Sequence, residues 1–180
     1  MNTTIPVKNK KPFRDITNEW FDNAVPNYNK FKERKYIDFN GRRLYFDGIY
    51  IKFKYMNNEK EIAQLLQEKF GGTIYTRPKV DLPQNAQTAD FKYINHRLKF
   101  NDYIDLKTIK SNGKNVIDNR IKKSRDQAFN FVLDFSESDL TYNEIINQLE
   151  MLYKNPYRNW VKTIIIIKNN DIRVFRRKNK

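Results

Sequence analysis

The spacing of apolar side chains changes several times between residues 57 and 135, and this succession limits the folds open to the chain. A helix is predicted where apolar residues recur every three or four positions, at Ile62, Leu65, Leu66 and Phe70. Asn57-Asn58 would begin this helix and Gly71-Gly72 would end it. The elements predicted next are strands at 73–76, 89–94 and 103–108, a helix over 114–129 and a buried strand at 131–135.

Further elements are predicted on both sides of this segment. Apolar and polar residues alternate from Arg43 to Tyr55 around Asp47-Gly48, which predicts a β-hairpin. On the carboxyl side we expect a helix over 140–153 capped by Ser136 or Ser138, a buried strand at 161–168 and a last strand at 172–176. The predicted class is α/β (α+β), with a mixed central sheet covered by helices on both faces. An N-terminal hairpin precedes its αβββαβ core, and an αββ extension follows.

The predicted domain organisation has two parts. Residues 1–40 are polar and basic with scattered aromatic residues, so we interpret them as a basic N-terminal arm with one short helix that docks on the rest. Residues 41–180 would form the functional domain, with its core at about 57–135. The opening eleven residues have no apolar stretch typical of a signal peptide, and no apolar run is long enough to span a membrane.

Charge and cysteine content restrict the function. Lys and Arg number 35 against 21 Asp and Glu, a net charge of +14, which points to a polyanionic partner rather than a small neutral substrate. The chain has no cysteine, which excludes disulfides, Cys-ligated zinc, iron–sulfur clusters and a thiol nucleophile. A membrane partner is not expected, because no segment pairs a basic face with a broad apolar one.

Three acidic residues and a lysine follow one another along the predicted core. Glu61 lies near the start of the first helix, Asp90 near the start of a strand, and Asp105 and Lys107 on the next strand. Side chains alternate along a strand, so Asp105 and Lys107 share one face while Leu106 points to the other. Carboxylates on neighbouring strands can hold a hard divalent cation, and Lys107 could stabilise charge that develops on a phosphate. These residues are the candidate catalytic set, and the three acids are the candidate metal ligands.

The set resembles the PD-(D/E)XK nuclease superfamily, whose members have a restriction-endonuclease-like αβββαβ core. The segments Glu61-Ile-Ala-Gln-Leu-Leu, Thr88-Ala-Asp-Phe and Asp105-Leu-Lys-Thr-Ile-Lys are similar to C-terminal nuclease domains of contact-dependent growth inhibition (CdiA-type) toxins, which have phage and mobile-element relatives. The resemblance covers roughly residues 57–135. Ala89 stands where the superfamily name has proline.

The resemblance implies a metal-dependent endonuclease that uses Mg²⁺, or another divalent cation such as Mn²⁺ or Zn²⁺. It implies RNA, and tRNA in particular, as the substrate of a toxin-type tRNase, with DNA as the alternative. It also implies an acidic immunity protein as a partner and a cytoplasmic site of action. Delivery would be as part of a secreted toxin or of a phage or mobile-element protein.

The residues leave other interpretations open. Asp105 and Lys107 could be an exposed ion pair of little value, and Asp90 could cap a turn. Glu61 could simply favour the helix dipole, with Glu68 as a rival ligand. His96, the only histidine, would serve a metal-independent ribonuclease. A non-catalytic nucleic-acid-binding protein of the same fold is a further alternative.

A polar stripe is predicted on the second helix, and it is the candidate nucleic-acid-binding surface. Asn115, Asn119, Lys123 and Gln127 recur every four residues, which would place them on one helical face. Arg120 adds positive charge for phosphate binding, and Lys110 and Lys114 flank the turn before the helix. An ordinary solvated helix face is the alternative.

Overall fold

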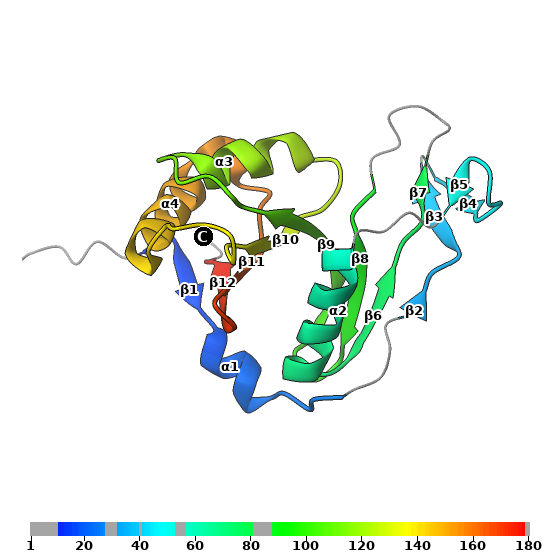
Figure 1. Cartoon of the computed structure of the whole chain (residues 1–180), viewed down its shortest axis with the longest axis horizontal. Helices are drawn as coiled ribbons and strands as arrows, with labels where there is room; N and C mark the ends of the chain where they lie inside the picture. Colours follow the sequence, from blue (N-terminus) through cyan, green and yellow to red (C-terminus); the bar gives the residue numbers. More distant parts are fainter. Residues whose placement is uncertain (1–10, 28–31, 40, 53–56, 81–87, 179–180) are drawn as a thin grey trace, which may run out of the picture.

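The computed structural model describes residues 11–27, 32–39, 41–52, 57–80 and 88–178. An eight-stranded sheet forms the centre of the molecule (Figure 1). In spatial order its strands are β1 (Phe13–Asp15), β12 (Asp171–Arg177), β11 (Thr163–Lys168), β10 (Asn130–Asp134), β9 (Phe100–Thr108), β8 (Phe91–Asn95), β6 (Thr73–Thr76) and β2 (Lys32–Glu33). The pairs β9–β10, β10–β11 and β2–β6 are parallel, and the other neighbours are antiparallel. The predicted mixed sheet is confirmed.

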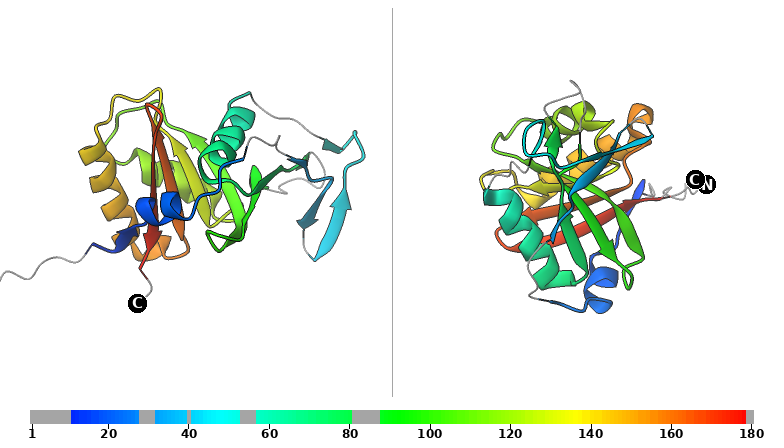
Figure 2. Two further views of the ribbon diagram at one scale, coloured as in Figure 1. Left: turned by 90° about the horizontal axis from the view of Figure 1, so that it is seen from below. Right: turned by 90° about the vertical axis from the view of Figure 1, so that its right-hand side faces the viewer.

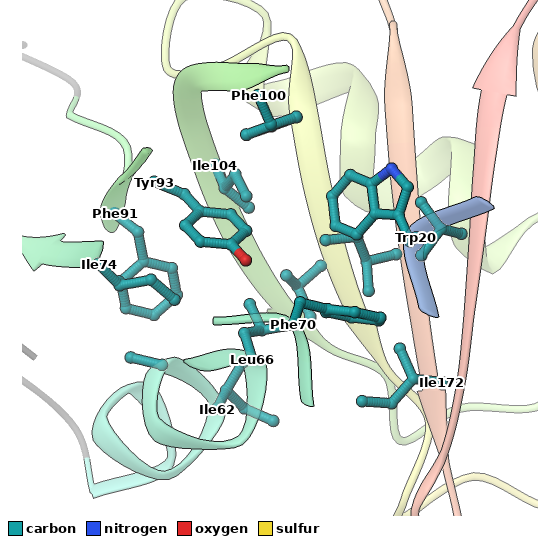
Figure 3. Close-up of a cluster of buried hydrophobic side chains, with 14 of the residues drawn as sticks. Trp20, Ile62, Leu66, Phe70, Ile74, Phe91, Tyr93, Phe100, Ile104 and Ile172 are labelled. Carbon is teal, nitrogen blue, oxygen red and sulfur yellow. The ribbon is translucent and has the colours of Figure 1, made fainter. Parts of the chain in front are cut away.

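Helices cover both faces of the sheet, because each face carries its own cluster of buried apolar residues. The helices α1 (Thr17–Asp22) and α2 (Asn57–Phe70) supply Trp20, Leu66 and Phe70 to one cluster (Figure 3). The other face is packed by α3 (Val116–Ile121) and α4 (Tyr142–Lys154), and both helices contribute to the second cluster. From α2 onward the helices and the strands of the large sheet follow the predicted order helix, three strands, helix, strand, then helix and two strands.

The predicted hairpin of residues 43–55 is wrong in its pairing. Strand β4 (Arg42–Tyr45) pairs with the preceding β3 (Tyr36–Phe39), and β5 (Ile51–Lys52) pairs with β7 (Lys79–Val80). The Asp47 carboxylate accepts hydrogen bonds from the backbone N–H groups of the three residues 49–51, which folds this segment into a loop. The β3–β4 hairpin projects from the large sheet on the side away from α4 (Figure 2). Residues 53–55 of the predicted hairpin lie outside the described part of the chain.

Two helix predictions need correction at their ends. The helix expected over 114–129 is α3, which ends at Ile121 and continues as the 3-10 helix η1 (Lys122–Ser124). The chain then turns, with the N–H groups of Gln127 and Ala128 donating to the Ser124 carbonyl, so that it can enter the parallel strand β10. For α4 the cap is Thr141 rather than Ser136 or Ser138. Thr141 forms a capping box with Glu144, which is a Thr-x-x-Glu signature in the sequence. A second 3-10 helix, η2 (Pro156–Arg158), follows α4.

The described residues before 40 contribute two strands to the large sheet and one helix to its core, whereas β3 belongs to the small β3–β4 sheet. Strand β1 pairs with β12 at one edge of the sheet, and β2 pairs with β6 at the other. Between them, α1 is the short helix expected here, and its Trp20 is only 1% exposed. The proposed functional division into an arm (1–40) and a domain (41–180) stays a prediction.

Candidate active site

The strand register brings three polar residues into one row across β6, β8 and β9. Two of them, Asp90 and Asp105, were predicted site residues, and the third, Arg77, was not. Phe91 pairs with Ile104, so extending this register by one residue places Asp90 directly opposite Asp105. In the same way, the pairing of Thr76 with Phe91 places Arg77 beside Asp90, and the Arg77 N–H donates to the Asp90 carbonyl at 3.2 Å. We call the two carboxylic acids Asp90 and Asp105, together with the neighbouring Arg77, the acidic row. The row crosses the antiparallel strands β6, β8 and β9, and β9 in turn pairs in parallel with β10.

The two carboxyl groups of the acidic row are buried and touch each other. Their side chains are 10% and 3% exposed, and a hydrogen bond links them. Asp90 Oδ2 also accepts the Leu106 backbone N–H at 2.8 Å. Lys107 Nζ lies 2.5 Å from Asp105 Oδ2, which confirms that residues 105 and 107 share a face of β9. Leu106 points the other way into the cluster beneath α2, as predicted.

Environment separates the pKa values of these two acids. Burial, and then the charge of Asp90, raises the pKa of Asp105 to about 7, although Lys107 opposes the rise. Burial also acts to raise the pKa of Asp90, but the charge of Lys79 and hydrogen bonds from Asp105, Lys79 and Leu106 bring it below its usual value. Just below pH 7 the protonated form is therefore favoured at Asp105, while Asp90 keeps its negative charge.

A second lysine and a different glutamate complete the cluster. Lys79 forms an ion pair with Asp90, and its Nζ lies 3.6 Å from Glu59 Oε1. Glu59 is in the first turn of α2, and its side chain is 12% exposed. Glu61, the predicted ligand, is exposed, because two residues along a helix turn the side chain by about 200°. The helical period could have predicted Glu59, because it lies three residues before the buried Ile62 and so on the same side of α2. Nothing in the sequence around Pro78 predicts a role for Lys79.

The donor set suits a cation that keeps part of its water shell. Asp90 and Asp105 offer adjacent carboxylate oxygens, and a bound cation would replace the proton that they share. Within the described residues, no three Asp, Glu, His or Cys side chains are grouped closely enough to hold a metal ion. Mg²⁺ is commonly bound through one or two carboxylates and several waters, so two ligands fit it. They fit Zn²⁺ less well, since its sites generally take three or four protein ligands.

His96 lies far from the acidic row. It is exposed in the turn that follows β8, whereas Asp90 immediately precedes β8. Six residues of extended chain separate them by about 20 Å. Glu68, the rival to Glu61, lies in the last turns of α2, where its carboxylate accepts a hydrogen bond from Gln64. Neither residue belongs to the cluster.

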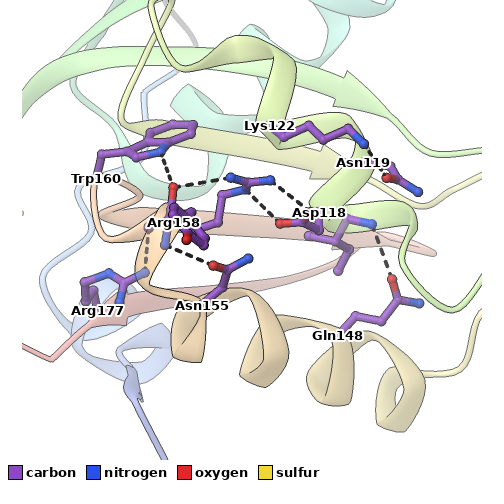
Figure 4. A network of polar contacts seen from close by, with 10 residues as sticks. Asp118, Asn119, Lys122, Gln148, Asn155, Arg158, Trp160 and Arg177 are labelled. Carbon is purple, nitrogen blue, oxygen red and sulfur yellow. Dashed lines mark hydrogen bonds and ion pairs between the residues drawn. The ribbon is translucent and has the colours of Figure 1, made fainter.

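The residues predicted to bind nucleic acid do not form a single helical stripe, because α3 ends before Lys123 and Gln127. Asn115 and Asn119 are exposed and, with Lys114, line a hollow of about 240 Å³ between α3 and α4. Figure 4 shows Asn119 beside Lys122, which donates to its side chain at 2.9 Å.

The other predicted binding residues lie apart from this hollow. Arg120 and Lys123 are exposed, and Lys110 pairs with Glu137 at 2.8 Å. Gln127 is different: its Oε1 accepts a hydrogen bond from Lys107 Nζ at 3.3 Å. Of the predicted binding residues, Gln127 is the one that contacts the candidate catalytic set.

Comparison with known proteins finds one family model and one solved structure that are similar to parts of the chain. Residues 101–172 match the family model of the contact-dependent growth inhibition CdiA C-terminal domain. No curated protein matches the chain. Among solved structures, it is similar to a CdiA-CT/CdiI toxin and immunity complex from Burkholderia pseudomallei, with 20% identity and a TM-score of 0.49 over 66% of this chain and 82% of that one. In the described part, no helix is long and apolar enough to cross a membrane. The segment that matches the CdiA C-terminal family contains Asp105, Lys107 and Gln127, and Asp90 precedes it.

Proposed function

We propose that this protein is a metal-dependent endonuclease that hydrolyses phosphodiester bonds in nucleic acid. The observation that carries the proposal is the buried pair Asp90 and Asp105, which lies beside the ammonium group of Lys107 and in which burial raises the pKa of Asp105 to about 7. Strongly perturbed pKa values cluster at functional sites, paired carboxylates can hold a hard cation, and an adjacent lysine can stabilise charge that develops on a phosphate. The net charge of +14 supports a polyanionic substrate.

Asp90 and Asp105 would hold a divalent cation, with Mg²⁺ favoured over Mn²⁺ or Zn²⁺. Such an ion supplies a Lewis acid for the phosphate and lowers the pKa of a bound water. Lys107 is held between Asp105 and Gln127, so its ammonium group is positioned to donate to a phosphate oxygen as negative charge develops. Lys79 balances the charge of Asp90 when no cation is present. Glu59 is better placed than Glu61 to orient a water of the cation.

The proposed biological role is that of a toxin with nuclease activity. The match of residues 101–172 to the CdiA C-terminal family supports this role, and the resemblance of the three motif segments favours RNA, and tRNA in particular. DNA is the alternative substrate. In this proposal the domain acts in the cytoplasm after delivery as part of a larger protein, and an acidic immunity protein neutralises it by covering its basic surface.

The first test is cleavage of total RNA and of plasmid DNA by the purified protein, with Mg²⁺ and with EDTA. We expect cleavage that requires the cation. Asp105→Asn preserves shape but removes the charge that the cation needs, so it should abolish cleavage and leave substrate binding intact or slightly tighter. Lys107→Ala should lower the rate at least 10²-fold. Asp22→Asn, at the exposed end of α1, is the matched control and should cleave normally.

The same assay separates the rival functions. His96→Ala should retain activity, because His96 lies at the far end of β8. A metal-independent ribonuclease would instead lose activity in His96→Ala, while Asp105→Asn would still cleave in EDTA. A non-catalytic binding protein would bind both nucleic acids and cleave neither under any condition.

A further inference from the structure

A second row of side chains lies one step from the acidic row on the same face of the sheet. Tyr103 precedes Asp105 by two residues on β9, so the two share a face about 7 Å apart along the strand. Lys92 pairs with Tyr103 in the β8–β9 register, and its ammonium lies 4.6 Å from the ring centroid. The β9–β10 register, extended by one residue, places Phe129 beside Tyr103. The candidate catalytic residues thus adjoin an aromatic and cationic surface.

A cavity of about 660 Å³ opens at this surface. Its wall includes Arg77, Tyr103, Gln127, Phe129 and Trp160, together with Arg125 and the three aspartates Asp38, Asp102 and Asp126. Two of these aspartates are already paired with cations, Asp38 with Arg34 and Arg43, and Asp102 with Lys162. This volume is in the range of pockets that bind small molecules or single nucleotides. Arg77 belongs to the acidic row, and Gln127 contacts Lys107, so two residues of the cavity wall adjoin the candidate active site.

Arg77 brings a buried positive charge to the cavity. The residue is 5% exposed, and its guanidinium stacks on the Tyr103 ring at 4.4 Å. Its Nε has no hydrogen-bond partner, and no ion pair to Arg77 is found among the described residues. Burial lowers its pKa, although the charges of Asp38 and Asp90 oppose this effect, so the desolvated cation is only partly compensated. An anionic group that entered the cavity would complete this compensation.

The aromatic part of the wall combines an exposed ring, Phe129, with a partly buried and fixed ring, Trp160. Phe129 is 44% exposed, although it follows directly after a buried alanine. The Trp160 indole N–H donates to the Tyr157 carbonyl at 3.0 Å, which fixes the orientation of the ring (Figure 4). Phe131 packs on its other side with ring centroids 6.0 Å apart. Exposed, fixed aromatic rings next to cations are the elements from which proteins build stacking sites for unpaired bases.

We propose that this cavity is a subsite for one unpaired nucleotide next to the phosphate that is cleaved. Arg77 takes the nucleotide's phosphate, and the base stacks on the aromatic wall of Phe129 and Trp160. The inference rests on the proposed nuclease function and narrows its substrate class. A base within a continuous duplex cannot enter such a cavity without leaving the stack, so the substrate is a single strand, a loop or an extruded nucleotide.

The test measures binding without cleavage. Asp105→Asn protein in EDTA is titrated with a labelled single-stranded RNA 12-mer, and with the same 12-mer annealed to its complement. We expect tighter binding of the single strand, with quenching of Trp160 fluorescence. Trp20, the other tryptophan, is buried in the core and should not respond. Adding Phe129→Ala should weaken single-strand binding about tenfold and leave duplex binding unchanged.

Tyr157→Ala provides the matched control. Tyr157 is 80% exposed, lies three residues before Trp160 and is not part of the cavity wall, so its removal should leave both affinities unchanged. Equal affinity for single strand and duplex, or equal effects of Phe129→Ala and Tyr157→Ala, would overturn the subsite even if the wild-type protein cleaves RNA. A selective loss in Phe129→Ala would support the subsite as a nucleotide-binding cavity even if the wild type cleaves nothing, in which case only the nuclease function fails.

Discussion

At the residue scale, the pair of Asp90 and Asp105 shows how burial and neighbouring charge divide two chemically identical groups. Their side chains touch, and both are almost completely removed from solvent. Lys79 and the Leu106 N–H stabilise the charged form of Asp90, whereas Asp105 faces the resulting negative charge. The pKa of Asp90 is therefore lowered and the pKa of Asp105 is raised. As a result, Asp105 holds a proton at pH values where Asp90 is charged.

This division predicts how the stability of the metal-free protein depends on pH. Between about pH 4 and pH 7 the folded protein keeps a proton on Asp105 that the unfolded chain has lost. The folded state then binds more protons, so the contribution of Asp105 to the free energy of unfolding must fall as pH rises through this window. Asp90 has the opposite sign, but its contribution is lost only below about pH 4, where an unperturbed aspartate becomes protonated.

Urea unfolding of the wild type and of Asp105→Asn in EDTA, at several pH values from 4.5 to 8, measures this contribution. The stability of the wild type relative to the variant should decrease across the range and level off above pH 7. A difference that is constant with pH would show that Asp105 titrates with an ordinary pKa and would contradict the shared proton.

At the scale of elements, the end of α2 depends on a glycine for two independent reasons. Gly71 has φ +75°, a conformation that other residues adopt at a cost of about 1–2 kcal/mol. A Cβ at this position would also lie 1.8 Å from the Val25 carbonyl oxygen, because Val25 and Gly71 form a β-bridge. The backbone of residues 24–27 passes over the end of the helix at this point, and this contact holds α1 and α2 together.

We expect Gly71→Ala to destabilise the fold by about 3 kcal/mol or more, since strain and a backbone clash add together. Gly113→Ala is the control: a Cβ there meets no atom within 4 Å, and its φ is not in the left-handed region. Thermal or chemical unfolding of the two variants measures the difference. Equal stabilities would mean that the contact between residue 25 and α2 is absent in solution.

At the scale of the whole molecule, the excess of positive charge should govern affinity for nucleic acid. Each phosphate contact releases counterions, so the logarithm of the affinity should fall linearly and steeply with the logarithm of the salt concentration. Lys114 and Arg120 are exposed on and beside α3, whereas Lys69 and Arg97 are exposed at the ends of α2 and β8 that are remote from the acidic row. The two pairs carry the same charge but lie in different parts of the molecule.

Neutralising Lys114 and Arg120 to glutamine in the Asp105→Asn background should reduce the salt slope by about 1 to 2, since each lost phosphate contact removes slightly less than one unit. Neutralising Lys69 and Arg97 in the same way should change it little. Binding of an RNA oligomer over 50–200 mM salt gives both slopes. If the second pair has the larger effect, nucleic acid binds on another face than the one proposed.

The amino-acid sequence by itself determined the order of the helices and of the large-sheet strands from α2 onward, and it determined that Asp105 and Lys107 share a face of their strand. These features are local: the period of apolar residues sets the element type, and alternation along a strand sets which residues share a face. Residues 73–76 form a strand as predicted, and α2 has the predicted bounds. The relation of Asp90 to Asp105 also follows locally once the antiparallel pairing of β8 and β9 is known.

Only the tertiary structure decided which residues from distant segments complete the site. Lys79 contacts Asp90 from a segment between two prolines. Arg77 lies beside Asp90 because β6 pairs with β8. Glu59 replaces Glu61 because the rotation of α2 about its axis is fixed by the core beneath it. The end of α3 at Ile121 could not be predicted from the local sequence either. The chain must leave the helix in order to enter the parallel strand β10, and this requirement outweighs the helical pattern of residues 122–129. Such long-range packing has no signature in the local spacing of residues, and the cavity beside Tyr103 exists only because of it.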